Sequence, residues 1–279
     1  SRDWSSDVCS SDLTGSRIMA QGAASLKRVH FELGGKSPVI VFDDADLDRA
    51  LEAVAFMIFS LNGQRCNAGS RLLVQDTIHD QFVKRLVEKT KSIRVGNPFD
   101  PKTEVGPLIH QNQLFKVKQH CDDAKTSGAV IHCAGALNSR VDLPNQGHWF
   151  EPAIVTGLNP DMPIVQEEVF GPVLAVLPFK DEAHALELAN NSRYGLSTYL
   201  WTSHIARAHR LARSFQSGMV WVNTEISRNL STPFGGMKDS GIGRDGGDWS
   251  FDFYMETRNV CIALDAHSIP KIGTQSTKK

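Results

Sequence analysis

A single cysteine, Cys66, ends a small polar loop that runs Ser-Leu-Asn-Gly-Gln-Arg-Cys from Ser60. A thiol is a useful nucleophile only as the thiolate, which nearby cations, backbone N–H groups and partial exposure favour. Arg65 comes directly before Cys66 and the small residues 67–69 follow it, so a cation and unhindered N–H groups can lie beside the sulfur. A lone cysteine is more often a small buried hydrophobe. The polar flanks favour a nucleophile here.

A glutamate, Glu32, lies 34 residues before Cys66, in the stretch Phe-Glu-Leu-Gly-Gly-Lys-Ser-Pro from Phe31. It follows an apolar run and precedes a Gly-Gly turn, where backbone can come close to a ligand. A carboxylate at such a strand end can act as a general base. The alternative is a solvated glutamate at the end of a strand.

Together these two stretches resemble the aldehyde dehydrogenase superfamily, in which Glu-Leu-Gly-Gly-Lys carries the general base and Gly-Gln-x-Cys the nucleophile. The resemblance covers residues 14–279 and continues, in the family's order, through 167–172 (Glu-Glu-Val-Phe-Gly-Pro) and 233–236 (Pro-Phe-Gly-Gly). It implies that Cys66 attacks an aldehyde carbon, that hydride passes to NAD, and that Glu32 activates the water that hydrolyses the thioester.

The same resemblance implies a set of cofactor contacts. Glu168 would bind the hydroxyls of the nicotinamide ribose, Phe170 would pack on the nicotinamide ring, and Gly34 would let backbone approach the ligand. Gln113 and Lys116 match positions near the adenosine ribose less specifically. For these last two residues, solvated helix positions remain the alternative.

Residues 223–234 match the segment that lines the family's aldehyde tunnel, and Asn223 and Phe234 match positions that contact substrate. Arg228, between them, is unusual for a tunnel that receives apolar aldehydes. A guanidinium fits a carboxylate through two parallel hydrogen bonds, so Arg228 predicts a carboxylated semialdehyde as substrate. The alternative is an ordinary surface arginine.

The elements that must position these residues alternate along the chain. Strands are predicted at 29–33, 39–42, 71–75, 129–133, 150–155, 173–178, 197–201 and 219–223. Helices are predicted at 16–27, at 47–58 after capping by Asp43 or Asp44, and at 80–93, 111–126, 181–191 and 204–215. This alternation indicates an α/β fold with a mostly parallel sheet covered on both faces. The Gly-rich run 235–247 lacks the features of a phosphate loop and is expected to pack closely beside the site.

The domain organisation is predicted from composition and from the resemblance. Residues 1–13 are rich in Ser and Asp and read as a foreign, disordered segment that resembles translated adapter sequence. Residues 14–33 are expected to be the remnant of a Rossmann-type NAD-binding domain. Residues 34–234 would form the catalytic domain, 235–256 would return to the cofactor domain, and 257–279 would hold an oligomerisation strand and tail. A longer parent protein is expected to be a homodimer or homotetramer, and this chain alone to be inactive.

The composition narrows the possible partners. A net charge of -1 over 279 residues, with both signs interspersed, argues against nucleic acid or a membrane surface as partner. No apolar run approaches the roughly 18 residues that span a bilayer. The five cysteines are scattered, which suits a reducing cytoplasm and predicts no metal site.

Two further hypotheses remain open. A chain without its cofactor half could be a non-catalytic fragment. An acylating dehydrogenase would pass the thioester to coenzyme A, which is disfavoured because Glu32 is in place to activate water.

Overall fold

The computed structural model describes residues 11–133, 143 and 147–273. The main strands are β2 (Pro38–Val41), β3 (Arg71–Gln75), β4 (Val130–Cys133), β5 (Ala153–Thr156), β6 (Val173–Phe179), β8 (Ser197–Trp201) and β9 (Met219–Val222). They form one sheet in the order β4-β5-β6-β3-β2-β8-β9. Every neighbouring pair is parallel except β4 and β5, which are antiparallel. The predicted α/β fold with a mostly parallel sheet is confirmed.

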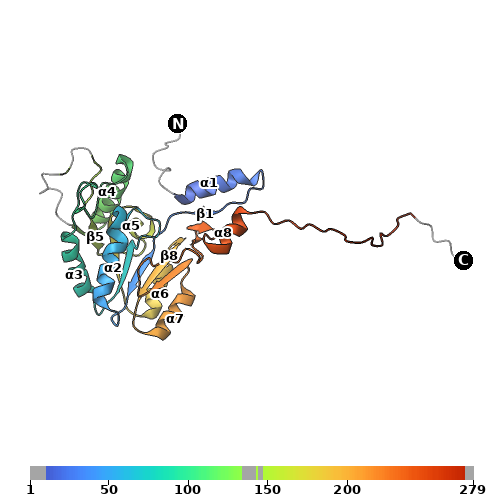
Figure 1. Cartoon of the computed structure of the whole chain (residues 1–279). Helices are drawn as coiled ribbons and strands as arrows, with labels where there is room; N and C mark the ends of the chain where they lie inside the picture. The colour runs from blue at the N-terminus through green and yellow to red at the C-terminus, as the bar shows by residue number, and fades with distance from the viewer. Residues whose placement is uncertain (1–10, 134–142, 144–146, 274–279) are drawn as a thin grey trace.

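The sheet has a hydrophobic core on each face, because successive side chains of a strand point to opposite sides. Val39 and Val41 of β2 enter one core, and Ile40 enters the other. The first core is covered by α2 (Leu47–Phe59) and α3 (His79–Lys91). The second is covered by α4 (Gln111–Thr126), α6 (Glu182–Asn190) and α7 (Ile205–Ser214), so the sheet lies between two helical layers (Figure 1).

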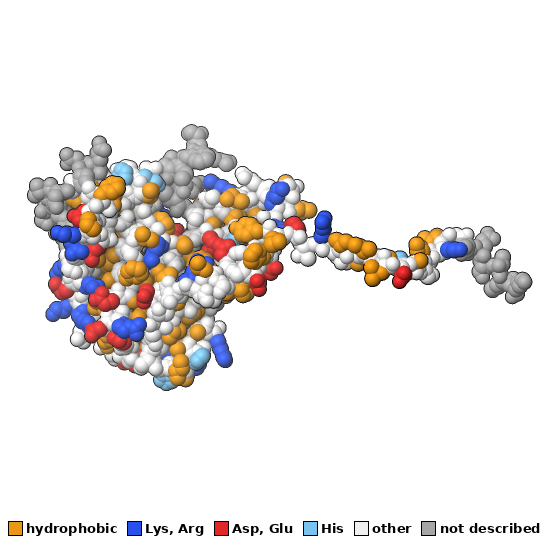
Figure 2. Space-filling view, viewed as in Figure 1, with side chains coloured by type: hydrophobic (Ala, Val, Ile, Leu, Met, Phe, Trp, Pro, Cys, Tyr) orange, Lys and Arg blue, Asp and Glu red, His pale blue; other side chains and the backbone are white. Residues whose placement is uncertain are grey.

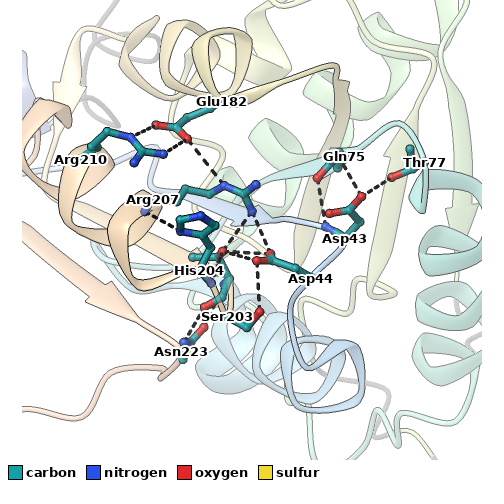
Figure 3. A network of polar contacts seen from close by, with 11 residues as sticks. Asp43, Asp44, Gln75, Thr77, Glu182, Ser203, His204, Arg207, Arg210 and Asn223 are labelled. Atoms are coloured by element: carbon teal, nitrogen blue, oxygen red, sulfur yellow. Dashed lines mark hydrogen bonds and ion pairs between the residues drawn. The ribbon is translucent and has the colours of Figure 1, made fainter.

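The helix α2 is capped by a different residue from the one expected. The N-cap is Asp46, whose Oδ1 accepts a hydrogen bond of 3.1 Å from the N–H of Arg49. The predicted caps make other contacts, since Asp43 contacts Gln75 and Asp44 contacts Arg207 (Figure 3). Three acidic residues lie within four positions here, and the sequence does not show which of them the helix follows.

The first described helix, α1 (Ser11–Ala23), begins and ends earlier than predicted. Residues 11–13, expected to be foreign and disordered, are helical, and Asp12 forms a 2.8 Å ion pair with Arg193. Residues 1–10 of that segment lie outside the described residues. Residues 24–27, predicted as helix, are turn and coil.

Several elements are so short that the sequence shows no hydrophobic periodicity for them. Two-residue strands pair antiparallel outside the main sheet: β1 (Phe31–Glu32) with β11 (Gly241–Ile242), and β7 (Tyr194–Gly195) with β10 (Met237–Lys238). The remaining elements are the 3-10 turn η1 (Ser60–Gly63), α5 (Pro163–Gln166) and α8 (Gly247–Tyr254). The strand β1 lies within the predicted strand 29–33, and the other short elements were not predicted.

Residues 255–273 leave the body of the molecule as an extended segment after α8 (Figure 1). The strand expected in the oligomerisation segment 257–279 is not formed over residues 257–273, because a strand is defined by a partner and this segment has none among the described residues. Hydrophobic side chains lie exposed along it, among them Val260 and Ile262 (Figure 2). Pairing with another subunit remains a prediction, as do the domain boundaries. In the part of the chain that the structure describes, no helix is long and apolar enough to cross a membrane.

Candidate active site

Cys66 follows a strained turn that joins α2 to β3. Leu61 and Asn62 adopt left-handed backbone angles, with φ of 51° and 60°, which cost a non-glycine residue about 1 to 3 kcal/mol each. The side chain of Asn62 offsets this strain: its Nδ2 donates to the carbonyl of Pro107 at 3.0 Å, and its Oδ1 accepts from the N–H of Gly106 at 2.7 Å. The turn is therefore held in place and fixes the start of the Cys66 loop.

The sulfur of Cys66 accepts hydrogen bonds from its own backbone N–H and from that of Asn67, which lower its pKa. Burial has the larger, opposite effect, and the nearby carboxylates of Glu32 and Glu168 also raise the pKa of the thiol. The net shift is upward. Both carboxylates thus lie within electrostatic range of the nucleophile, and the thiol keeps its proton at neutral pH.

The guanidinium of Arg65 is held at the end of α2, within electrostatic range of Cys66. Its Nη2 donates to the carbonyl of Met57 at 2.7 Å, at the carboxyl end of α2, and its guanidinium lies 5.6 Å from the ring centre of Phe56. A cation at the end of a helix stabilises the helix dipole. The charge of Arg65 therefore acts on the end of α2 as well as on Cys66.

Glu32 is held by pairing between chain segments that are far apart in sequence. It lies opposite Gly241 in the β1–β11 pair, and its side chain is 25% exposed. Burial, followed by repulsion from Asp245, raises its pKa to about 7, against the lowering effects of Arg244 and Arg228. A carboxylate with a pKa near 7 can both take and return a proton at neutral pH, as a general base must.

Gly34 and Gly35 bring the three candidate groups together. A Cβ at Gly34 would collide with the carboxylate of Glu168, and a Cβ at Gly35 would collide with the backbone carbonyl of Cys66. The N–H of Gly35 also donates to Oε1 of Glu168 at 2.9 Å. The two glycines come shortly after Glu32, so one tight segment contacts both Cys66 and Glu168.

Glu168 and Phe170 lie on a loop that is held from inside the protein. Burial raises the pKa of Glu168, against the hydrogen bond from Gly35 and the charges of Lys116 and Lys36. Phe170 has a left-handed φ of 54°. The buried Gln113 holds this backbone, because its Nε2 donates to the carbonyls of residues 169 and 170, each at 2.8 Å. That nitrogen is not available to a ribose, so the structure assigns Gln113 to support of the loop.

Lys116 and the fully buried Lys36 place positive charge beside Glu168. Lys36 is 2% exposed, its Nζ has no hydrogen-bond partner among the described residues, and its pKa is lowered to about 7, chiefly by burial and then by Arg71. Sequence reasoning did not single out Lys36. Its place in the Gly-Gly-Lys run was the available signal.

The predicted substrate residues divide into two groups. The guanidinium of Arg228 lies 4.2 Å from the ring centre of Phe234, and its charge lowers the pKa of Glu32. Phe234 pairs through its backbone with Asp245, which also acts on Glu32. Arg228 and Phe234 therefore lie near Glu32.

Asn223 belongs to a separate polar network at the ends of β2 and β8 (Figure 3). Its Oδ1 accepts from the N–H of Thr202 at 3.0 Å, and its Nδ2 donates to the carbonyl of the same residue at 2.8 Å. Both ends of the amide are engaged, so Asn223 joins β9 to the end of β8. The structure gives no support to a substrate contact through this side chain.

Tyr199 is a buried residue that the sequence did not indicate. Its hydroxyl donates to the carbonyl of Asn67 at 2.8 Å, and its ring stacks on Trp221 with 5.2 Å between centres. It thereby holds the residue that follows Cys66.

The chain was compared with known proteins. A model of the aldehyde dehydrogenase family matches residues 8–260. The 5-carboxymethyl-2-hydroxymuconate semialdehyde dehydrogenase of Escherichia coli is 46% identical over 240 residues, which are 85% of this chain and 50% of that protein. The crystal structure of HpcC from Thermus thermophilus has a TM-score of 0.88 and 46% identity, over 94% of this chain and 52% of that one. An NAD+ complex of aldehyde dehydrogenase from Bacillus cereus has a TM-score of 0.85 and 38% identity, over 91% and 51%.

The chain spans about half the length of the relatives it matches. Within that half, the family's match extends over the Cys66 loop, Glu32, the Glu168 loop and the Gly-rich run 235–247. The chain belongs to the aldehyde dehydrogenase family.

Proposed function

We propose that this chain carries the catalytic half of an NAD-dependent enzyme that oxidises an aldehyde to a carboxylic acid through a cysteine thioester. The observation that supports this most is the segment Gly34–Gly35, which contacts both Cys66 and Glu168 and comes shortly after Glu32. The proposed nucleophile Cys66, the proposed base Glu32 and the proposed ribose-binding Glu168 are thus all positioned by the segment around Gly34–Gly35.

The steps follow from the positions of these residues. Cys66 gives its proton to solvent water and its sulfur bonds to the aldehyde carbon, and the N–H groups beside the sulfur can then donate to the oxygen that becomes negative. NAD, when bound, supplies the acceptor for the hydride that leaves this carbon. Glu32 then takes a proton from water, whose oxygen attacks the thioester carbon and breaks the C–S bond. Glu32 returns this proton to the sulfur that leaves, so the carboxylic acid and the thiol of Cys66 are the products.

Two residues are proposed to hold NAD. The buried carboxylate of Glu168 is fixed by the N–H of Gly35 at 2.9 Å, which leaves its second oxygen to accept from ribose hydroxyls. Phe170 follows on the same loop and would pack on the nicotinamide. Lys116 supplies positive charge beside Glu168.

For the substrate we propose a carboxylated semialdehyde from aromatic ring cleavage, 5-carboxymethyl-2-hydroxymuconate semialdehyde in particular. Arg228 is exposed, lies over Phe234 and acts on Glu32, so its guanidinium can bind a substrate carboxylate beside the reacting centre. The name of the Escherichia coli relative supports the same choice. A 2-hydroxymuconate semialdehyde is the second candidate, since it also offers a carboxylate to Arg228.

The test uses a completed enzyme, in which residues 14–279 follow the amino-terminal half of the Escherichia coli relative. Replacing the base by Glu32→Gln should preserve the first burst of NADH and reduce steady-state turnover by about 10²- to 10⁴-fold, because hydride transfer precedes hydrolysis. Cys66→Ser should abolish both phases. Glu187→Gln, on the exposed face of α6, is the matched control and should change neither. Loss of the burst in Glu32→Gln would refute the assignment of Glu32 to hydrolysis alone.

A further inference from the structure

Two neighbouring residues, His30 and Glu32, meet Asp245 from a distant part of the sequence beside the β1–β11 pair. Nε2 of His30 lies 3.8 Å from Oε1 of Glu32, and Nδ1 of the same ring lies 3.6 Å from Oδ1 of Asp245. One ligand atom from each of the three residues lies within 4.8 Å of the others. The cluster thus combines one imidazole with two carboxylates.

The imidazole is built into this position. The side chain of His30 is 7% exposed, and its ring centre lies 5.3 Å from that of Phe253. On another side the ring meets Gly243, where a Cβ would collide with the imidazole. These contacts hold the ring so that its two nitrogens face the two carboxylates.

Nε2 of His30 is buried and has no hydrogen-bond partner among the residues that the structure describes. A buried polar atom in this state costs about 1 to 3 kcal/mol, so native proteins rarely leave one unless a ligand or ion satisfies it. The atom faces Oε1 of Glu32 at 3.8 Å, which is too long for a hydrogen bond. A buried nitrogen left without a hydrogen bond is an observation beyond the grouping of the carboxylates, and it indicates a ligand.

The donor set selects the chemistry of that ligand. One imidazole nitrogen with two carboxylate oxygens matches Zn²⁺, and Co²⁺ accepts the same donors. Bonds of about 2.0 to 2.2 Å require the three donors to close on the ion by about 1 Å. Glu32 and Asp245 are 25% and 38% exposed, so their side chains have the freedom to do so.

We propose that His30, Glu32 and Asp245 form a binding site for a divalent transition metal ion, with Zn²⁺ as the best match, and that the bound ion occupies the general base. The second clause rests on the proposed function, whereas the first rests on the cluster alone. The sequence could not reveal the site, because ligands at positions 30, 32 and 245 follow no metal-binding spacing.

The surroundings indicate a reversible, inhibitory site more than a permanent one. Arg244 and Arg228 lie near enough to act on Glu32, and their positive charges oppose a cation. Arg244 is also fixed, since its Nη1 donates to the carbonyls of Gly236 and Gly243 at 2.8 and 2.6 Å. We therefore expect micromolar affinity, weaker than that of a structural zinc site.

Binding is tested on the full 279-residue chain. Co²⁺ titrated into the protein should produce one equivalent of visible d–d absorption, which Zn²⁺ should displace with micromolar affinity by calorimetry. His30→Asn and Asp245→Asn should each weaken binding at least tenfold. The control His209→Asn, on the exposed face of α7, should bind as the wild type does. Unchanged affinity in His30→Asn would overturn the proposal.

The thiol of Cys66 is the main competing ligand for the metal. Two experiments distinguish binding to Cys66 from binding to the cluster of His30, Glu32 and Asp245. Cys66→Ser should retain the metal, and loss of binding in this variant would move the site to the sulfur. In the completed enzyme, Zn²⁺ should lower steady-state turnover and spare the NADH burst, whereas loss of the burst would also indicate binding to Cys66. If the completed enzyme oxidises no aldehyde, the titration still decides whether the metal site exists.

Discussion

Replacing Lys36 by methionine should remove a large part of the pH dependence of stability. Lys36 is fully buried, its Nζ has no hydrogen-bond partner among the described residues, and its pKa is lowered to about 7 from 10.5. Between these two pH values the unfolded chain binds a proton that the folded chain does not, so the free energy of unfolding rises with pH in this window. Below about pH 7 both states carry the proton and this contribution no longer changes.

The size of the effect follows from the shift. One pKa unit corresponds to about 1.4 kcal/mol, so the stabilisation gained between about pH 7.5 and pH 9 should be roughly 2 kcal/mol. Lys36→Met retains the length and apolar stem of the side chain and removes the titration. The difference between wild type and variant should therefore change by roughly 2 kcal/mol over this range.

Urea denaturation followed by fluorescence at a series of pH values provides the measurement. Lys84→Met, on the exposed face of α3, is the control and should run parallel to the wild type. If Lys36→Met also runs parallel, Lys36 keeps its proton in the folded protein. The nearby carboxylates of Glu168 and Glu167 would then dominate over burial.

The remaining predictions concern the site. Iodoacetamide at about pH 8 should modify the exposed Cys261 first, then Cys66, whose pKa is raised, and last the buried Cys121, whose pKa is raised more strongly. Peptide mapping gives the order of modification. Modification of Cys66 before Cys261 would contradict the raised pKa of Cys66. In the completed enzyme, Arg228→Ala should weaken binding of the carboxylated semialdehyde by about 1.5 to 3 kcal/mol, seen in KM, and leave a neutral short aldehyde unaffected; equal effects would make Arg228 structural. Gly35→Ala should abolish turnover and lower stability because its Cβ meets the Cys66 carbonyl, whereas Gly22→Ala, with only ordinary contacts, should do neither; an active Gly35→Ala would refute the close approach.

The sequence predicted the parts of this protein that depend on local patterns. The buried strands around Val39 and Leu72 are short apolar runs, and their parallel arrangement follows from the helices between them. The polar flanks of Cys66 and the glycines after Glu32 likewise indicated a site.

What the sequence left open depends on contacts between distant residues. Gln113 and Asn223 both carry amides, and only the fold shows that these amides bind backbone instead of ligands. Arg65 is adjacent to Cys66 in sequence, yet its guanidinium turns to the end of α2. His30 becomes part of a three-residue cluster only through Asp245, which lies near the other end of the chain.

The pairing of β1 with β11 also has a consequence for the order of folding. Cys66 lies between two segments that are close in sequence, α2 and β3, whereas Glu32 is placed by residues 241–242 near the other end of the chain. Contacts across such long separations close slowly, because the loop entropy is lost before the contact is made. During synthesis the Cys66 loop can therefore form while residues 241–242 are still inside the ribosome. We expect a newly made chain to pass through a stage in which Cys66 is already in place and Glu32 is not yet held.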